Sequence, residues 1–155
     1  MIDSNGPVLN TRLVNAMQEM LEDNNERTRS KMINALMNAT LLSPVIRQIA
    51  VTEEAQKEGA ARMRFTLLSN TKGEKYYMAF TDWAALNKWK KEKGQQVVHM
   101  DFDDFAAVVT RKDNNVAGFV INPFSENITI PKEMVISLKK QKDQLEKGTG
   151  RGPKS

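Results

Sequence analysis

The order in which helix-like and strand-like segments follow one another is the feature that most constrains how this chain folds. Apolar residues recur at helical spacing in five segments, and six short runs with the character of strands lie between them. The order is two helices, three strands, a helix, a strand, a helix, two strands and a final helix. Each amphipathic helix must bury its apolar stripe against another element. The order therefore predicts a single α+β domain, in which a mixed β-sheet packs against an N-terminal helical pair, two short inserted helices and a C-terminal helix.

Residues that commonly cap or end helices lie at the boundaries of the helical segments. Side chains expected to cap the first, third and fourth helices are Asn10, Thr81 or Asp82, and Asp101. Pro44 prevents the second helix from continuing, and Gly94 supplies a stop for the third. Pro131 suits the first position of the fifth helix, so every predicted helix has at least one local boundary signal.

The strand-like runs are 45–51, 63–68, 76–80, 97–100, 116–121 and 128–130. Residues 70–73 include a glycine that can adopt a positive φ, which predicts a hairpin turn between the second and third runs. The polar segment 53–61 is expected to connect the first two strands. We predict a flexible N-terminus over residues 1–8, a folded domain over 9–147 and a disordered basic tail over 148–155.

Composition excludes several classes of protein. The 155 residues include no cysteine, which excludes disulfides, thiolate metal sites and a cysteine nucleophile. The longest apolar run, 116–121, is far shorter than the ~20 residues that a membrane-spanning helix needs. The N-terminus opens with polar residues where a signal peptide would be apolar. We therefore expect a cytoplasmic protein that does not bind membranes.

The net charge of +4 is not spread over the domain. Of 23 Lys or Arg and 19 Asp or Glu, seven and three lie from Pro131 onward, which leaves 16 of each sign in the preceding 130 residues. A basic excess confined to a terminal helix and tail is typical of a solvated surface, and it argues against nucleic acid as a partner. Nucleic-acid binding through the tail is a third hypothesis, which predicts strong salt dependence.

His99 is the only histidine, and it precedes the carboxylates Asp101, Asp103 and Asp104. Interpreted as chemistry, this group is a metal-ligand set or a general base with acidic neighbours. Interpreted as structure, Asp101 caps a helix, the other two acids lie in its first turn, and alternation from Val98 places His99 toward solvent. We favour the structural interpretation because zinc sites need three or four convergent ligands. We accordingly predict no catalytic residue, no cofactor and no metal site.

Two polar dipeptides follow predicted strands, Thr81-Asp82 and Asn122-Pro123. Ligands commonly bind at the ends of strands in α/β sheets. If the two dipeptides lie side by side, they would line a polar groove, and we name all four residues as candidate groove residues. In the alternative interpretation, both dipeptides are turn and cap residues.

Apolar stripes on two predicted helices give further candidates. Trp83 and Trp89 lie on one side of the third helix, where they either stack on a ligand or, as we favour, pack in the core. On the fifth helix, Val135, Leu138 and Leu145 form a stripe that needs a surface to cover it. We name these three residues as candidate interaction residues.

Three blocks of the sequence coincide with the pattern of a known family. They are a helix running into a strand through a Pro-Val step (32–45), a strand ending in Phe-Thr-Asp that opens a helix (77–82), and a glycine-led apolar strand ending in Asn-Pro (118–123). In this order and spacing, from Leu9 to Leu138, the chain resembles the N-terminal-domain family of SseB, the bacterial "enhanced serine sensitivity" proteins.

Three features depart from the family's pattern. Asp82 replaces the usual Ser, Phe124 replaces a small residue, and these 155 residues do not include the second domain of longer relatives. The resemblance implies the α+β fold, a bacterial origin and a cytoplasmic location, and it supplies no reaction and no catalytic residue.

The sequence thus favours a binding role. We predict a non-catalytic module that binds a protein or peptide partner through a sheet edge or groove, or that self-associates. The alternative is a small-ligand sensor, related to amino acids as the family's name implies, or an unrecognised enzyme.

Overall fold

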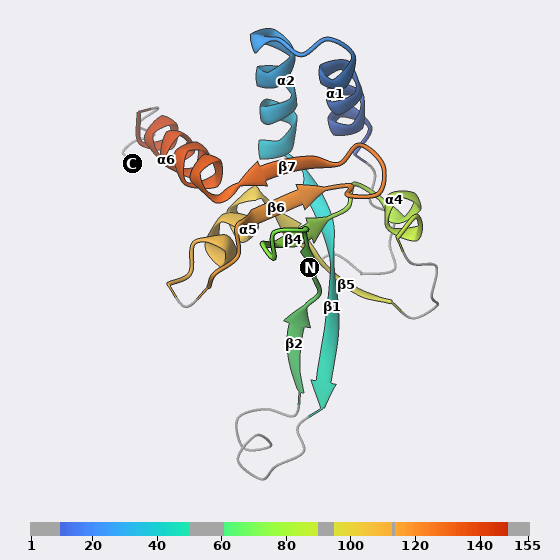
Figure 1. Ribbon diagram of the computed structural model, residues 1–155. Helices are drawn as coiled ribbons and strands as arrows, with labels where there is room; N and C mark the ends of the chain where they lie inside the picture. The colour runs from blue at the N-terminus through green and yellow to red at the C-terminus, as the bar shows by residue number, and fades with distance from the viewer. Residues whose placement is uncertain (1–9, 50–60, 90–94, 113, 149–155) are drawn as a thin grey trace.

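The computed structural model describes residues 10–49, 61–89, 95–112 and 114–148. Within these residues the chain has the predicted α+β fold, with helices and strands in the order shown in Figure 1. The predicted flexible N-terminus, most of the connecting segment 53–61, Gly94 and the basic tail beyond Gly148 lie outside the described residues.

Helices α1 (Thr11–Glu22) and α2 (Glu26–Met37) form a pair at one end of the molecule (Figure 1). Residues at helical spacing make up the buried side of α1: Leu13, Ala16, Met17 and Met20. Helix α2 opens with a capping box, in which Thr28 N donates to Asn25 Oδ1 at 2.9 Å and Asn25 N donates to Thr28 Oγ1 at 3.0 Å. These two bonds satisfy N–H groups that a helix start otherwise leaves unpaired.

The long strand β1 (Thr40–Ile49) corrects a sequence-based prediction. It pairs antiparallel with β5 (Gln96–Asp101) along its first half and with β2 (Ala61–Phe65) along its second half. The sequence predicted a strand beginning after Pro44, but β1 runs through the proline. Pro44 O accepts a hydrogen bond from Thr66 N at 3.1 Å. Thr66 lies beyond the end of β2, so the missing N–H of the proline removes no bond from the regular ladder.

The second sheet has the order β3-β4-β6-β7. Its strands are β3 (Leu67–Ser69), β4 (Lys75–Ala79), β6 (Gly118–Ile121) and β7 (Ile128–Pro131). Strands β4 and β6 are parallel and the other pairs are antiparallel, so the sheet is mixed, as predicted. The predicted hairpin at 70–73 joins β3 to β4, and Gly73 has a φ of 82°.

The two sheets are joined where the first part of β1 meets the residue that follows β4. The predicted strand 63–68 is divided into β2 and β3, because the chain leaves β1 there and pairs with β4. Leu42 and Phe80 exchange two backbone hydrogen bonds of 2.8 Å, and Ser43 Oγ donates to Met78 O at 2.8 Å. The end of β4 is therefore held against β1.

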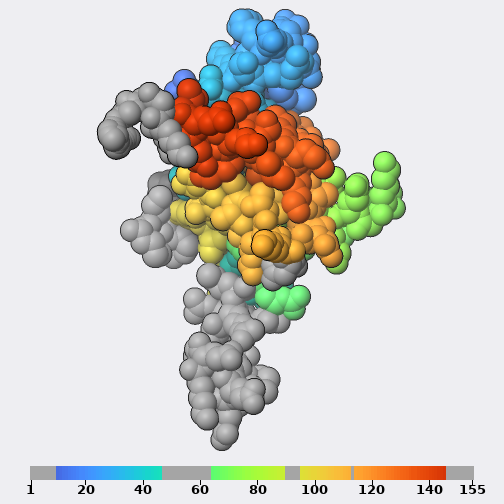
Figure 2. All heavy atoms as spheres, turned by 90° about the vertical axis from the view of Figure 1, so that its left-hand side faces the viewer, coloured from blue at the N-terminus to red at the C-terminus, as the bar shows by residue number. Residues whose placement is uncertain are grey.

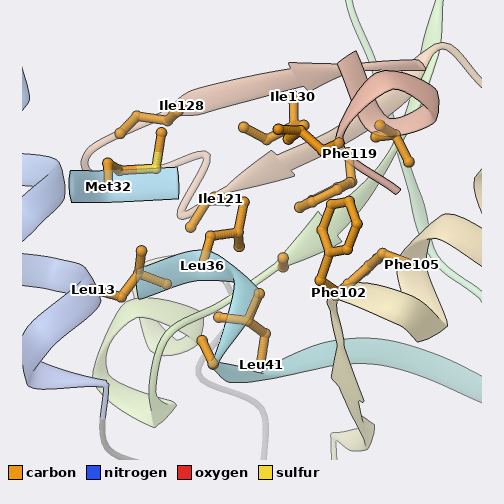
Figure 3. Packing of buried hydrophobic residues seen from close by; sticks show 14 of the residues in the cluster. Leu13, Met32, Leu36, Leu41, Phe102, Phe105, Phe119, Ile121, Ile128 and Ile130 are labelled. Atoms are coloured by element: carbon orange, nitrogen blue, oxygen red, sulfur yellow. The ribbon is translucent and has the colours of Figure 1, made fainter. Parts of the chain in front are cut away.

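Helices α5 (Phe102–Val109) and α6 (Lys132–Gly148) lie on one side of the molecule, below the helical pair (Figure 2). Between them and the sheet, the rings of Phe105 and Phe119 stack with centroids 4.6 Å apart. Figure 3 shows side chains from α1, α2, β1, α5, β6 and β7 meeting in this main core: Leu13, Met32, Leu36, Leu41, Phe102, Phe105, Phe119, Ile121, Ile128 and Ile130.

The short helix α4 (Trp83–Asn87) covers a second, smaller cluster. Its buried members are Leu42, Met78, Phe80, Ala85, Leu86 and Val97. Trp83 and Trp89 pack against this cluster, and Trp89 stacks on Phe80 with centroids 6.1 Å apart. The core interpretation of the tryptophan stripe is therefore correct.

Pro131 ends β7, and α6 begins at Lys132, so the prediction that Pro131 opens the helix is wrong. Lys132 N donates to Ala117 O at 2.7 Å, which fixes the direction of alternate backbone groups along β7. The backbone N–H of Thr129 therefore points away from β6, and so would an N–H at Pro131. An outward position on an edge strand is where a sheet accommodates proline without losing a bond.

Candidate functional site

Polar side chains from distant segments meet where β4 and β6 end. Thr81 is fully buried and Asn122 is 2% exposed. Asn122 Oδ1 accepts from Thr81 N at 3.0 Å, and Asn122 Nδ2 donates to Thr81 Oγ1 and to Glu126 Oε1, each at 2.9 Å. Asn10 Nδ2 donates to Thr81 O at 2.7 Å. We call Asn10, Thr81, Asn122 and Glu126 the polar junction.

The parallel pairing of β4 with β6 explains why these residues come together. Parallel strands end at the same edge of a sheet, and Asn122 N still donates to Ala79 O at 2.8 Å beyond the last strand pair. Asn122 then takes a φ of 49°, a left-handed conformation that asparagine tolerates better than most residues. Its carbonyl accepts from Ser125 N and Asn127 N, which closes the turn into β7.

Glu126 is held in its charged form by this network. Burial alone would raise the pKa of Glu126, but hydrogen bonds from Asn122, its own backbone, Gln18 and Ser125 outweigh burial and lower the pKa. Gln18 Nε2 on α1 donates to Glu126 Oε2 at 3.2 Å. The carboxylate therefore connects the helical pair to the β6–β7 turn.

The role of Asn10 differs from the predicted one. Its side chain makes no capping hydrogen bond to α1. Instead Asn10 Nδ2 donates to Thr40 O at 2.8 Å as well as to Thr81 O. These carbonyls lie at the start of β1 and just after β4, where a partly buried acceptor needs a donor. Asn10 thus fixes the start of α1 against both sheets.

The four predicted groove residues lie together, but their polar groups are largely used within the protein. Thr81 Oγ1 donates to Asp82 Oδ2 at 3.1 Å, and Asp82 Oδ1 accepts from Ala85 N at 2.8 Å, which caps α4. Both amide hydrogens of Asn122 are also engaged, and Pro123 is partly buried in the following turn. The geometry fits the turn-and-cap interpretation, and a binding role for this groove stays a prediction.

The candidate stripe on α6 is divided between the core and the surface. Val135 is fully buried and Leu138 is 9% exposed, and both belong to the main core. Leu145 is 71% exposed, and Ile136 on another side of the helix is 48% exposed. The protein's own core therefore covers the first two residues of the stripe, and an interaction role stays a prediction for the exposed Leu145.

His99 is placed differently from the prediction. Both imidazole nitrogens are buried and find no hydrogen-bond partner among the described residues, so the expectation of a solvent-facing side chain is wrong. The register explains this, because His99 lies opposite Leu42, a buried residue of the second cluster. The nearby carboxylates are engaged elsewhere: Asp101 and Asp104 form the capping box of α5.

Asp103 ties α5 to α6. Lys139 Nζ and Lys142 Nζ each lie 3.1 Å from a carboxylate oxygen of Asp103. Partial burial would raise the pKa of Asp103, but the hydrogen bonds and charges of the two lysines outweigh it and lower the pKa. Because these groups are partly exposed, the ion pairs contribute modestly to stability.

Within the described ranges, no three His, Asp or Glu side chains are grouped closely enough to hold a metal ion. Among the helices of those same ranges, none is long and apolar enough to cross a membrane.

A cleft of about 360 Å³ opens between the start of β4 and the loop after α5, and sequence reasoning missed it. Its lining residues, which we call the loop cleft, are Leu67, Lys75, Tyr77, Arg111, Asn114, Asn115 and Val116. The only signal in the sequence is the Asn114-Asn115 turn beside Arg111. The side chains that face it across the cleft come from segments more than 30 residues earlier in the chain.

A family comparison covers most of this structure. The family model described as "SseB protein N-terminal domain" matches residues 13–136. The chain belongs to the SseB family. This SseB domain includes the loop cleft, both sheets and most of the polar junction, while Asn10, Leu138 and Leu145 lie outside the matched residues. Neither a curated protein nor a solved structure matched the chain.

Proposed function

We propose that this SseB-family chain is a non-catalytic interaction module of the bacterial cytoplasm, which binds an extended segment of another protein along a projecting β-ribbon. The ribbon is the pairing of residues 45–49 of β1 with β2. The observation that carries the proposal is that the ribbon extends beyond the rest of its sheet. The last pair between β1 and β5 is Val45↔Gln96, whereas pairing with β2 continues to Ile49↔Ala61. Figure 1 shows the ribbon leaving the body of the molecule.

No described residue pairs with one backbone edge of the ribbon, so this edge can accept a further strand. Thr66 N donates to Pro44 O, so Pro44, and with it Ile46, directs its backbone groups toward β2. Alternation then directs the N–H and C=O groups of Arg47 and Ile49 to the opposite side, beyond the last pair with β5. Backbone groups that find no partner among the described strands are the template for strand addition.

The exposed side chains of the ribbon fit the same role. Ile46 is 59% exposed, and its cross-strand partner Arg64 is also exposed. A two-stranded ribbon alone is marginally stable in water. A third strand beside β1 would place an apolar side chain against Ile46 and stabilise the ribbon. The partner we propose is therefore an extended segment with a β-branched or aromatic residue at that position.

The non-catalytic part of the proposal is supported by how the polar candidates are used. Thr81, Asp82 and Asn122 bond one another or backbone groups, and the acids near His99 cap or pair with other elements. A general base or nucleophile needs a partner within hydrogen-bond reach and access to a substrate. His99 meets neither condition, because its nitrogens are buried and no described residue forms a hydrogen bond with them.

A peptide-display selection on the immobilised chain, followed by calorimetric titration of a selected peptide, tests this proposal. We expect the peptide to shift the amide resonances of residues 45–49. Arg47→Pro removes an outward N–H while keeping the bonds to β2, and it should weaken binding by about tenfold or more. Thr129→Pro is the matched control, because it removes an outward N–H from the edge strand β7 and should leave binding unchanged.

Three outcomes decide the proposal. Selective loss of peptide binding in Arg47→Pro supports it. Equal effects of the two proline variants, or shifts confined to residues outside the ribbon, refute it. Concentration-dependent dimerisation that Arg47→Pro abolishes would identify the occupant as a second copy of this chain and refute the heterologous partner.

A further inference from the structure

The geometry points to a second binding site, for a small organic anion, in the loop cleft. The ligand class is a carboxylate or phosphate that carries a short apolar group. This site is separate from the ribbon in its residues, since no lining residue of the cleft belongs to residues 45–49 or to β2. Its volume of about 360 Å³ lies within the range of small-molecule sites.

The cleft presents a hydrogen-bond donor that finds no acceptor among the described residues. Val116 N donates to Asn114 Oδ1 at 2.8 Å, which fixes the orientation of that amide. Asn114 Nδ2 must then donate to Tyr77 Oη, at 2.7 Å, and to Val108 O, at 2.6 Å. Tyr77 Oη is therefore an acceptor in this bond, and no described residue accepts its hydrogen. Because Tyr77 is 6% exposed overall, a ligand in the cleft is the natural acceptor for that hydrogen.

A cation lies beside this donor. Lys75 lies two residues before Tyr77 on β4, so both side chains project from the same face of the strand. Lys75 forms no ion pair with any other described residue. Arg111 also lines the cleft, where it already has an interaction of its own, and no carboxylate is among the described lining residues. The Lys75 ammonium and the Tyr77 hydroxyl donor favour a ligand group that is negatively charged and accepts hydrogen bonds.

The remaining walls define the other half of the ligand. Leu67 pairs with Tyr77 across β3 and β4, and Val116, which is 7% exposed, faces them from the loop. Apolar walls beside a few converging polar groups are typical of ligand sites. A small aromatic or branched aliphatic group would cover Leu67 and Val116 while its anionic end meets Lys75 and Tyr77.

Nuclear magnetic resonance titration of the full chain, at low salt, tests the site with three probes of similar shape. Benzoate and phenyl phosphate are the two anions, and benzamide is the neutral control. We expect at least one anion to shift the resonances of Tyr77 and the Asn114 side-chain amide, and benzamide to shift neither. The stronger of the two anions identifies the class of ligand.

Variants separate the cleft from general surface charge. Lys75→Gln and Tyr77→Phe should each weaken anion binding by about tenfold, because each removes a hydrogen bond or charge aimed at an anion. Lys72→Gln is the matched control, since Lys72 is an exposed lysine in the nearby hairpin turn that does not line the cleft. Binding in Arg47→Pro should equal that of the wild type, which separates this site from the ribbon.

Three results would overturn the inference. The first is an absence of shifts at Tyr77 and Asn114 up to about 10 mM of either anion, well above the ~1 mM Kd of a weak small-molecule site. The second is benzamide binding as tightly as the anions. The third is an equal loss of binding in Lys72→Gln and Lys75→Gln.

Discussion

Replacing Asn122 by alanine tests whether the polar junction is structural. Thr81 N, which donates to Asn122 Oδ1, lies in a residue with no exposed surface. Loss of its acceptor costs about 1–3 kcal/mol, the penalty for a buried unpaired group. Alanine at a φ of 49° adds roughly 1–2 kcal/mol of backbone strain. Asn122→Ala should therefore lower the free energy of unfolding by about 2–5 kcal/mol, a large part of the ~5–15 kcal/mol that stabilises a typical domain.

Asn127 supplies the matched control. It has a φ of 55°, close to that of Asn122, but its side chain is exposed and lies outside the polar junction. Asn127→Ala therefore carries the backbone strain alone, about 1–2 kcal/mol. The difference between the two variants, roughly 2 kcal/mol, measures the amide network of Asn122.

Urea unfolding followed by tryptophan fluorescence gives both values by linear extrapolation. Trp83 and Trp89 pack on the second cluster, so their emission reports loss of packing. If the two alanine variants lose the same free energy within about 0.5 kcal/mol, the network contributes nothing to stability. Asn122 would then be free to serve a ligand, and the turn-and-cap interpretation would be refuted.

Two further predictions concern the two ends of strand β6. Gly118→Ala should cost about 2–5 kcal/mol in urea unfolding, because its Cβ would lie 2.2 Å from Ile130 O at a φ of 150°. Gly73→Ala, where no atom lies within 4 Å, should cost only ~1–2 kcal/mol, and equal losses would contradict the clash. Glu126→Gln should flatten the pH profile of unfolding: the lowered pKa of Glu126 gives stability above its ordinary value of 4.5 that is lost as pH falls through the folded value. Parallel wild-type and variant profiles below about pH 5, or an equal flattening in the exposed control Glu22→Gln, would contradict that assignment.

The parts of the fold that depend on residues close together in the sequence were predictable from the sequence. Asp82 and Asp101 cap helices through bonds to residues three positions later, as predicted. Asn10 has the same local signature, but its amide bonds to carbonyls 30 and 71 residues away. Pro44 likewise predicts a boundary between a helix and a strand, yet β1 runs through it because Thr66, which lies opposite, is beyond the end of β2. Both errors arise because a tertiary neighbour overrides a local preference.

The difference between local preference and tertiary neighbours also explains why the sequence predicts Asn122 as a candidate site residue and does not predict Lys75. A buried polar group must find hydrogen-bond partners, so polar residues at the ends of buried strands usually form hydrogen bonds within the protein. Thr81 and Asn122 form such internal hydrogen bonds. They are conspicuous in the sequence because the ends of β4 and β6 need polar side chains that bond to each other. A binding surface depends instead on residues whose groups the fold leaves without partners. These residues can be identified only when the pairing of the strands is known. Ile46 and Lys75 are ordinary strand residues in the sequence. Ile46 is exposed because it lies beyond the last pair between β1 and β5. Lys75 lines the loop cleft because β4 pairs with β6, which follows the loop that forms the other wall.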